Sequence, residues 1–462
     1  MKILIFGTGD YYERYKKWLV QEEILALLDN SLQKQGTEID GIKVLSPKEG
    51  IELPYDKIII LSFYVREMKQ QLEALKVDTR DILHFYDLHD FLKGKKPHYP
   101  IKASAAAREI LNDNRKKQET ILLLSTDMLP VGGPARVLFR TGKILKKNGF
   151  SVLFASMIDG ELKEDIENAG IPVMVDESLQ VSTMEEIKWI NGFRLLICNT
   201  INFYVFLSKR NCDIPIIWWL HDSMFFYGGV DVKVLNNISQ KNLKIVSVGE
   251  IPRKAMNKLA PQFEITDFLY GIKDKEEIEQ RISGLKVCFA VMGYVEERKG
   301  QDILVKAIQR LPLYIRERLK VYMIGKNVSA MAKEIMQEIL YIPEIFMTGV
   351  LAPAEFEEIF SEIDVLICPS REDPMPAVVS EAMRSKIPCI VSDAVGTARY
   401  IHEGVEGWIF QSGNAEELAK KIEWCVHHKS QLQSIGINAR KLYEKYFSMD
   451  VFERNLLTLI KT

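Results

Sequence analysis

The chain has 462 residues, with 61 lysines and arginines against 63 aspartates and glutamates and a formal net charge of −2. This length exceeds a single typical hydrophobic core and predicts two or three domains, and the near balance of charge excludes a global electrostatic attraction to nucleic acid or to an anionic surface. Hydrophobic residues make up 47% and charged residues 27%, as in a soluble globular protein.

The cysteines and the apolar runs indicate the cellular setting. The six cysteines are scattered, show no Cys-x-x-Cys spacing and mostly lie in apolar runs, as expected for small core residues in a reducing cytoplasm. The apolar run at the N-terminus is too short for the apolar region of a secretory signal. No apolar run approaches the roughly 18 residues that a membrane-spanning helix needs. We therefore expect a cytoplasmic protein without structural zinc, with at most a peripheral contact at the inner face of the cell membrane.

Residues 1–95 predict a small Rossmann-like accessory domain. A strand at Lys2–Phe6 leads into Gly7-Thr8-Gly9, a helix is expected through Leu19, and the next strand ends at Asp29. These glycines with an acid about twenty residues later imitate a dinucleotide fingerprint, but the third glycine position is Tyr12. Because a bulky ring there would obstruct helix packing and crowd a pyrophosphate, we favour a scaffolding or oligomerising role over nucleotide binding.

Two further α/β domains are expected after this one. Residues 96–117 are predicted to be a linker and a helix, the helical run being 104–117. Residues 118–275 and 285–445 each alternate apolar strands with helices, as Rossmann-like units do, and 446–462 is expected to be a terminal helix. No internal sequence repeat is evident.

Two loops of the 285–445 segment carry candidate chemistry. Each follows an apolar strand and opens a helix: residues 292–302 contain adjacent cations, and residues 369–383 contain two acids eight positions apart. Ligands of open α/β sheets bind outside the carboxyl ends of the strands, where cations suit a diphosphate. The alternative for both loops is that their charged residues have no ligand and are solvated surface charges or cap a helix.

The order and separation of these loops resemble the donor-binding domain of retaining GT-B glycosyltransferases, glycosyltransferase family 4. Further matches are Ser125–Leu138, which resembles that family's first glycine-bearing loop, Pro215–Asp222, which resembles its strand ending in histidine, and Phe346–Val350, which resembles its segment under the nucleotide base. The resemblance covers roughly residues 120–462. It implies an α/β fold of GT-B architecture, two facing Rossmann-like domains with a cleft, here preceded by the small Rossmann-like domain.

The resemblance also assigns roles. Lys299, helped by Arg298, would stabilise the leaving diphosphate, Glu381 would hold ribose hydroxyls, Asp373 the sugar's hydroxyls, and His221 would contact the sugar from the opposite domain. A second set would line the donor site: Gly132, Gly133, Gly293, Val350, Met375, Pro376, Ala377 and Val378. The implied reaction moves a sugar from a nucleotide-diphosphate-sugar to a glycan, glycolipid or glycoprotein hydroxyl with retention, in cell-surface polysaccharide or glycoconjugate synthesis, with no metal or other cofactor.

The acceptor side is less well marked. Phe225, Phe226 and Tyr227 follow His221 and either stack on acceptor sugars or belong to the core, whereas the two tryptophans 218 and 219 are expected to be core. The helix after Gly133 carries five cations that form either a solvated face or a contact with anionic lipid.

Two positions depart from the family pattern. Asp373 stands where the family usually has glutamate, and Tyr294 where family members often have arginine. We interpret both as tuning of donor choice or rate. A sugar-nucleotide epimerase or a phosphorylase on a GT-B frame, or a catalytically silent sugar-binding subunit, are the alternatives, and a nicotinamide-dependent oxidoreductase is disfavoured by Tyr12.

Overall fold

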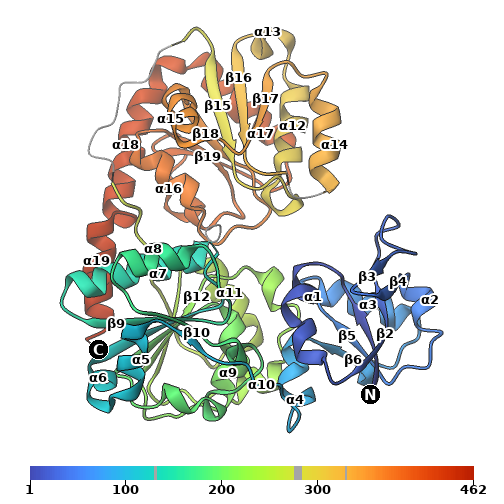
Figure 1. Cartoon of the computed structure of the whole chain (residues 1–462). Helices are drawn as coiled ribbons and strands as arrows, with labels where there is room; N and C mark the ends of the chain where they lie inside the picture. The colour runs from blue at the N-terminus through green and yellow to red at the C-terminus, as the bar shows by residue number, and fades with distance from the viewer. Residues whose placement is uncertain (130–132, 275–283, 328–329, 462) are drawn as a thin grey trace. The chain divides into compact units, whose positions relative to one another are not determined.

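The computed structural model describes residues 1–129, 133–274, 284–327 and 330–461, in two compact units. The first unit is Met1–Val246 with Ala255–Ile265, and the second is Ser247–Lys254 with Thr266–Thr462. Three sheets, largely parallel and flanked by helices, make up the fold (Figure 1). In the part of the chain that the structure describes, no helix combines the length and the apolar character needed to cross a membrane.

The first sheet has the strand order β3-β4-β2-β1-β5-β6. Its strands are β1 (Lys2–Phe6), β2 (Glu23–Leu28), β3 (Glu38–Ile39), β4 (Ile42–Leu45), β5 (Lys57–Ile60) and β6 (Ile82–His84). Its helices are α1 (Asp10–Tyr15), α2 (Pro47–Gly50), α3 (Val65–Ala74) and α4 (Leu88–Phe91). The helical segment expected through Leu19 does end there, but only its first part is an α-helix: α1 stops at Tyr15 and the chain continues as a 3-10 helix over Lys16–Leu19.

The second sheet has the order β14-β13-β12-β11-β8-β9-β10-β7. Its strands are β7 (Lys102–Ala103), β8 (Thr120–Ser125), β9 (Ser151–Ser156), β10 (Val173–Val175), β11 (Leu195–Asn199), β12 (Ile216–Leu220), β13 (Leu243–Ser247) and β14 (Ile265–Asp267). Its helices are α5 (Ala105–Asn112), α6 (Asn114–Glu119), α7 (Gly133–Lys147), α8 (Leu162–Asn168), α9 (Tyr204–Ser208), α10 (Val232–Asn236) and α11 (Glu250–Leu259).

The single helix expected over residues 104–117 is wrong. Asp113 divides it, because its carboxylate accepts hydrogen bonds from the amides of Arg115 and Lys116 and so starts α6 as a new helix. The short strand β7 pairs antiparallel with β10, so the second sheet takes in residues of the expected linker.

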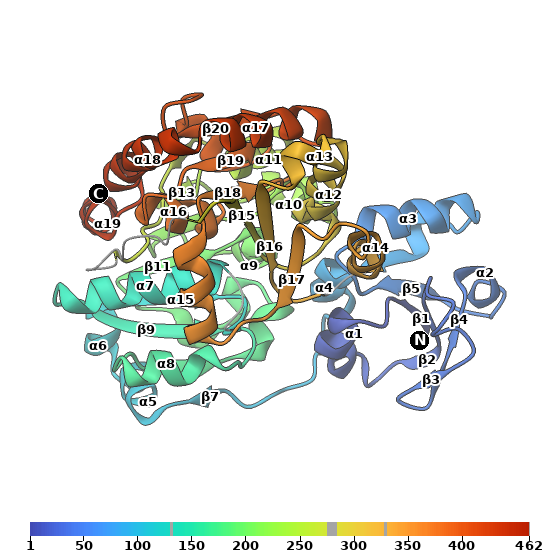
Figure 2. The ribbon, with the colours of Figure 1, turned by 90° about the horizontal axis from the view of Figure 1, so that it is seen from above.

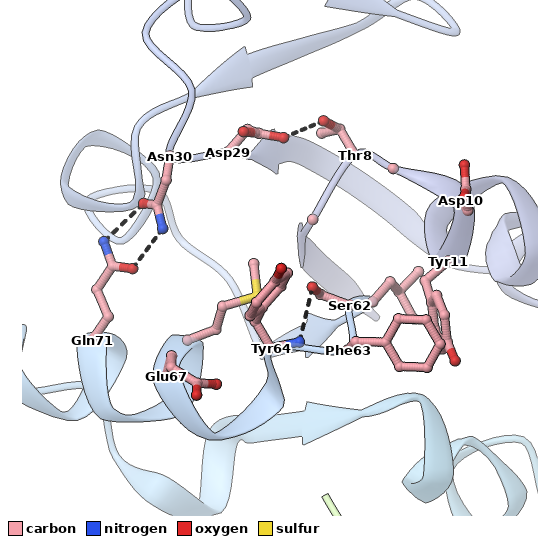
Figure 3. A pocket seen from close by; sticks show the side chains of 14 residues that line it. Thr8, Asp10, Tyr11, Asp29, Asn30, Ser62, Phe63, Tyr64, Glu67 and Gln71 are labelled. Atoms are coloured by element: carbon pink, nitrogen blue, oxygen red, sulfur yellow. Dashed lines mark hydrogen bonds between the residues drawn. The ribbon is translucent and has the colours of Figure 1, made fainter. Parts of the chain in front are cut away.

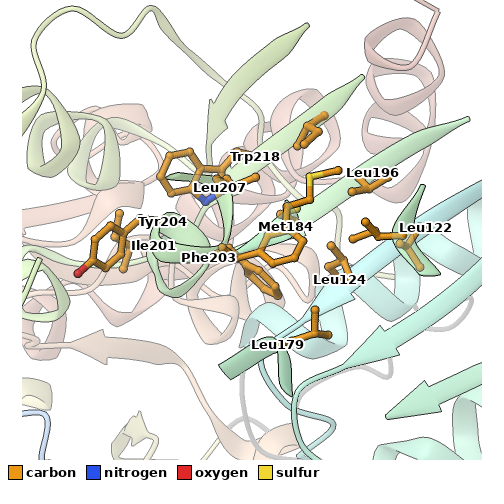
Figure 4. Close-up of a cluster of buried hydrophobic side chains, with 14 of the residues drawn as sticks. Leu122, Leu124, Leu179, Met184, Leu196, Ile201, Phe203, Tyr204, Leu207 and Trp218 are labelled. Atoms are coloured by element: carbon orange, nitrogen blue, oxygen red, sulfur yellow. The ribbon is translucent and has the colours of Figure 1, made fainter. Parts of the chain in front are cut away.

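Buried apolar side chains hold the second sheet to its covering segments (Figure 4). Leu122 and Leu124 of β8, Leu196 of β11 and Trp218 of β12 pack against side chains of the α9 region, including Phe203. Both strand tryptophans are buried, Trp218 with 0% and Trp219 with 1% of its surface exposed, which confirms them as core.

The third sheet is parallel throughout, in the order β17-β16-β15-β18-β19-β20. Its strands are β15 (Val287–Met292), β16 (Leu319–Ile324), β17 (Ile345–Gly349), β18 (Val365–Cys368), β19 (Cys389–Ser392) and β20 (Gly407–Phe410). Its helices are α12 (Gln301–Arg310), α13 (Leu313–Arg316), α14 (Ala330–Ile339), α15 (Pro353–Glu362), α16 (Ala377–Arg384), α17 (Ala415–His427), α18 (Leu432–Tyr446) and α19 (Met449–Leu459).

The strand order of the third sheet fixes where its loops meet. β15 pairs with β16 on one side and with β18 on the other, so the chain reverses its direction of winding between β15 and β18. Helices α17 and α18 both contact β20 (Figure 2). The terminal helix α19 begins at Met449, capped by Ser448, and buries Phe452 and Leu456.

Candidate functional site

The loop after β15 is held against the loop after β18. Gly300 ends the first loop in a left-handed conformation, φ +70°, and a Cβ there would lie 2.1 Å from the carbonyl oxygen of Pro369. Only glycine fits both conditions without a shift of backbone. The amide of Arg371 also donates to the carbonyl oxygen of Arg298 at 2.8 Å. The two loops that the sequence marked as chemical therefore form one surface at the switch point of the third sheet.

The two predicted cations meet the predicted acidic loop. Lys299 Nζ donates to Asp373 Oδ2 at 2.5 Å, and the side chains of these two residues are 22% and 8% exposed. Arg298 donates to Glu296 Oε1 at 2.8 Å and to the carbonyl oxygen of Glu372 at 3.2 Å. A buried carboxylate is thus neutralised by a lysine that an anionic ligand can share.

Asp373 is held in place by its own backbone. Its amide donates to the carbonyl oxygen of Ala394, and its carbonyl oxygen accepts from the amide of Gly396 at 2.8 Å, so the loops after β18 and β19 are paired. Further along, the hydroxyl of Tyr270 donates to the carbonyl oxygen of Met375. These bonds fix the direction of the Asp373 side chain, as a binding carboxylate requires.

Helix α16 follows this loop and carries Glu381. Met375 and Pro376 are buried, and Ala377 and Val378 at the start of the helix are half-buried. The Glu381 side chain is half-buried and forms no hydrogen bond or ion pair with the residues that the structure describes. It therefore remains available as an acceptor for hydroxyl groups.

A second ion pair lies at this surface and was not predicted from the sequence. Arg371 donates to both carboxylate oxygens of Asp302, at 2.8 and 2.7 Å, and to the carbonyl oxygen of Glu297. Burial by itself would raise the pKa of Asp302, but the hydrogen bonds from Arg371 and Lys306 outweigh it and lower that pKa. This bidentate pair ties the loop after β18 to the first turn of α12.

The remaining predicted donor residues of this unit, Gly293 and Val350, each follow a strand of the third sheet. Gly293 follows β15, and the next side chain, Tyr294, is 36% exposed. Val350 follows β17 and is 75% exposed. The structure therefore leaves Val350 open to solvent at the end of its strand.

His221 and Asp222 follow β12 in the other unit and are both buried. Burial lowers the pKa of His221 to about 3 and raises the pKa of Asp222 to about 6, the latter against backbone hydrogen bonds such as that from the Ile201 amide at 2.6 Å. His221 Nε2 is buried and has no hydrogen-bond partner among the described residues. His221 is thus a neutral imidazole near neutral pH with one free polar atom.

The other predicted residues of this unit are two glycines and three aromatic residues. Gly132 is outside the described residues, and Gly133 is the first residue of α7. Tyr227 is buried, while Phe225 and Phe226 contact Phe63 in the loop after β5, with ring centroids 6.5 and 5.2 Å away. Both phenylalanines thus contact the first sheet's loops.

No cluster of three or more histidine, cysteine, aspartate or glutamate side chains suited to a metal ion occurs within the described ranges. The charged groups of the candidate site are therefore lysine, arginine and isolated carboxylates. Such a set binds phosphate and hydroxyl groups through charge and hydrogen bonds.

The fold and this surface define a class. The second and third sheets are doubly wound, and the third carries paired cationic and acidic loops at its switch point. This is the GT-B fold, here preceded by the first sheet, which is of the same kind. Residues 272–442 match the family model "Glycosyl transferases group 1", and residues 1–83 match the model "C2185-like, N-terminal". The segment 272–442 is thus similar to group 1 glycosyl transferases.

Individual proteins show similarity to the chain as well. The chain is similar to spore coat protein SA of Bacillus subtilis, 22% identical over 383 residues that cover 73% of this chain and 98% of that protein. It is also similar to a sulfoquinovosyl transferase of Arabidopsis thaliana, 28% identical over 159 residues, 34% of this chain and 29% of that protein.

Among solved structures, HepE of Anabaena in complex with UDP-glucose superposes with a TM-score of 0.60 at 18% identity, covering 74% of this chain and 99% of that one. A sucrose-phosphate synthase of Thermosynechococcus elongatus gives the same TM-score at 15% identity, covering 74% of this chain and 98% of that one. At these identities the likeness shows the fold.

Proposed function

We propose that this chain is a retaining glycosyltransferase of glycosyltransferase family 4, which moves a hexose from a nucleotide-diphosphate-sugar to a hydroxyl of a glycan, glycolipid or glycoprotein. The observation that carries the proposal is the meeting of Lys299 with Asp373 at the switch point of the third sheet, beside Arg298 and the unengaged carboxylate of Glu381. The cations of this surface suit the diphosphate of such a donor, and its carboxylates suit the hydroxyl groups of the sugar and the ribose.

Lys299 has the central role in the proposed reaction. The bond between the anomeric carbon and the diphosphate oxygen breaks, the acceptor oxygen bonds to that carbon on the same face, and the acceptor proton passes to the departing diphosphate. Negative charge grows on the diphosphate, and a lysine already fixed by Asp373 stabilises it without rearranging. Arg298, oriented by Glu296, adds a second positive charge.

Glu381 and Asp373 serve the uncharged parts of the donor in this proposal. Glu381 accepts hydrogen bonds from ribose hydroxyls, and the second oxygen of Asp373 accepts from a hydroxyl of the transferred sugar. The free Nε2 of His221 supports a hydrogen bond between that ring and a sugar hydroxyl, because a buried polar atom without a partner is costly unless a ligand satisfies it.

The setting we propose is the synthesis of cell-surface polysaccharide or glycoconjugate in the cytoplasm. It is supported by similarity to spore coat protein SA and to the capsular polysaccharide biosynthesis glycosyltransferase CapM of Staphylococcus aureus, 26% identical over 103 residues, 22% of this chain and 27% of that protein. We also propose that no metal is needed, since lysine and arginine can supply the charge that a metal would supply. Activity should survive a chelator, and a full loss that manganese or magnesium restores would contradict this.

A peripheral membrane contact through α7 is a separate proposal. Of its basic residues, Lys146 donates to the carbonyl oxygens of Ala169 and Gly170 and so stabilises the fold, while Arg136 and Lys143 form no ion pair with the described residues. Flotation with vesicles that contain anionic lipid, against neutral vesicles, tests the contact, and equal behaviour with both would count against it. An oligomer through residues 1–95 is tested by light scattering of the full chain and of a chain lacking that segment.

The test of the transferase is turnover of a panel of UDP-, GDP-, dTDP- and ADP-sugars, with the anomeric configuration of the product read by NMR. Lys299→Ala is expected to lower kcat about 100-fold, as the loss of one transition-state charge contact does, and Glu381→Gln to raise the donor KM. The matched controls are Lys420→Ala on α17 and Glu338→Gln on α14, both exposed. Release of epimerised or phosphorolysed sugar would favour the alternative enzymes, and donor binding without turnover would favour a silent sugar-binding subunit.

A further inference from the structure

The first sheet has a cavity of its own, lined by other residues than those of the surface formed by Lys299 and Asp373. It has a volume of about 450 Å³ and is lined by the loops that follow β1, β2 and β5 (Figure 3). Gly9 comes from the first loop, Asp29 from the second and Phe63 from the third. Such a volume holds a nucleoside or a small saccharide.

The cavity lies where the topology of the sheet predicts a ligand. β1 pairs in parallel with β2 on one side and with β5 on the other. The chain therefore reverses its winding at β1, and the loops at the carboxyl ends of these strands open a crevice. The cavity occupies this crevice.

The sequence-based objection to a ligand here was Tyr12, and the structure removes it. Tyr12 is not among the residues that line the cavity; its side chain is 1% exposed and its hydroxyl donates to Asp40 Oδ2 at 2.9 Å. The ring therefore packs in the core of the domain. Gly9 faces open space instead, since a Cβ placed there meets no atom within 4 Å. The expectation that Tyr12 crowds this loop is wrong.

The chemistry of the lining disfavours a diphosphate. Three carboxylates, those of Asp10, Asp29 and Glu67, line the cavity, and none of the 14 described residues that line it is a lysine or an arginine. The nearby ammonium group of Lys34 is engaged by Asp29 at 3.3 Å and by the Thr8 hydroxyl at 2.9 Å. A dinucleotide or nucleoside diphosphate would bring its negative charge beside these carboxylates without a free cation to offset it.

The same lining suits hydroxyl groups on a ring. Asp29 accepts hydrogen bonds from the Thr8 hydroxyl, the Ser31 amide and Lys34, which leaves about one of the roughly four acceptor positions of a carboxylate free. Burial favours a higher pKa for Asp29, but the bonds from Thr8 and Ser31 outweigh it and lower that pKa, so the group is a charged acceptor at neutral pH. The rings of Tyr11, Phe63 and Tyr64 line the cavity on the other side (Figure 3), and aromatic faces pack on the apolar face of a sugar or a base.

We propose that this cavity is a second ligand site, which binds an uncharged ring bearing adjacent hydroxyl groups, carried either by a nucleoside or by a neutral saccharide. Asp29 accepts from the hydroxyls, and Phe63 and Tyr64 cover the ring. The site touches the rest of the first unit directly: Phe63 contacts Phe226, and Tyr64 contacts Phe225 with ring centroids 5.4 Å apart, in the segment that follows His221. An occupant of the cavity therefore packs against side chains that also contact this segment.

The test uses the full chain and ligand-observed NMR with two arms of probes. Adenosine and uridine form one arm, glucose, N-acetylglucosamine and maltotriose the other, and UDP and NAD+ are the charged comparisons. Gly9→Trp fills the cavity, and because Gly9 has φ −99° its backbone accepts a side chain without strain. The matched control is Gly284→Trp, which also faces open space but lies outside the cavity. Glu381→Gln separates this site from the proposed donor site.

We expect at least one neutral probe to bind the wild type, Glu381→Gln and Gly284→Trp alike, and to bind Gly9→Trp at least about tenfold more weakly. Binding confined to one arm identifies the source of the ring. The proposal is overturned if no neutral probe depends on Gly9, or if UDP or NAD+ is the probe whose binding Gly9→Trp abolishes. Should Gly9→Trp fail to fold by circular dichroism, Tyr64→Ala, at a side chain 59% exposed, and Asp29→Asn replace it with the same expected loss.

Discussion

The buried His221 predicts a specific dependence of stability on pH. Its pKa in the folded chain is about 3, against an ordinary value of 6.5, because burial disfavours the imidazolium. Below pH 6.5 the unfolded chain binds a proton that the folded chain does not, so stability falls as the pH falls. At pH 5.0 this costs about 2 kcal/mol relative to pH 7.5, and about 5 kcal/mol below pH 3.

The neighbouring Asp222 acts in the opposite direction. Its pKa is raised by burial from 3.8 to about 6, so below pH 6 the folded chain holds a proton that the unfolded chain releases. Its charged form destabilises the folded chain by about 3 kcal/mol above pH 7, of which about 1.4 is recovered at pH 5.0. The two residues together should leave the wild type only about 0.6 kcal/mol less stable at pH 5.0 than at pH 7.5.

Substitution separates these two contributions. From pH 7.5 to 5.0, His221→Phe should gain about 1.4 kcal/mol of stability and Asp222→Asn should lose about 2 kcal/mol. Native-state amide exchange of peptides spanning β12 measures the free energy of opening of this region, which suits a chain of several domains better than a single unfolding transition does. His402→Phe is the matched control, because that side chain is 76% exposed. Equal changes for His221→Phe and the wild type would refute the buried, neutral state of His221.

Two further predictions concern the loops of the third sheet. Gly300→Ala should lower the stability by about 1 kcal/mol for the left-handed conformation and further for the overlap with the Pro369 carbonyl, and it should weaken nucleoside-diphosphate binding. Gly413→Ala, with φ +84° and open space, should lower the stability only by the cost of the left-handed conformation. Equal melting temperatures and equal affinities for the two variants would contradict this. Arg371→Ala should lower the stability by about 1 kcal/mol and weaken nucleoside-diphosphate binding by loosening the loop after β18. A double-mutant cycle with Asp302→Asn should give a coupling energy of that size. Additive effects would show that the pair does not hold the loop.

Local sequence was enough to find the two strands of the third sheet that precede its charged loops. The apolar strands expected before these two loops run over Val365–Cys368 and Val287–Met292 in the structure. Both are continuous apolar runs followed by turn residues, as buried parallel strands are. Helix boundaries that depend on one side chain were harder to predict. The cap that Asp113 supplies starts a new helix within a sequence that otherwise has an unbroken helical pattern.

The sequence did not predict which side chains far apart in the chain contact one another. Lys299 and Asp373 are 74 positions apart, and Arg371 and Asp302 are 69 apart. Each of these side chains has several opposite charges nearby in the sequence, so only the order of strands in the sheet decides which partners meet. For the same reason Phe225 and Phe226, read as acceptor-side candidates, were not expected to contact Phe63.

The sequence by itself determined that this chain is a set of doubly wound α/β domains and which loops carry its charged chemistry, because strands, turns and glycine positions are local patterns of polarity and backbone freedom. The tertiary structure alone decided that Lys299 is paired, that His221 is neutral and that Tyr12 turns away from the cavity beside Gly9. Those outcomes depend on burial and on distances between residues far apart in the chain, and both quantities exist only once the sheets have formed.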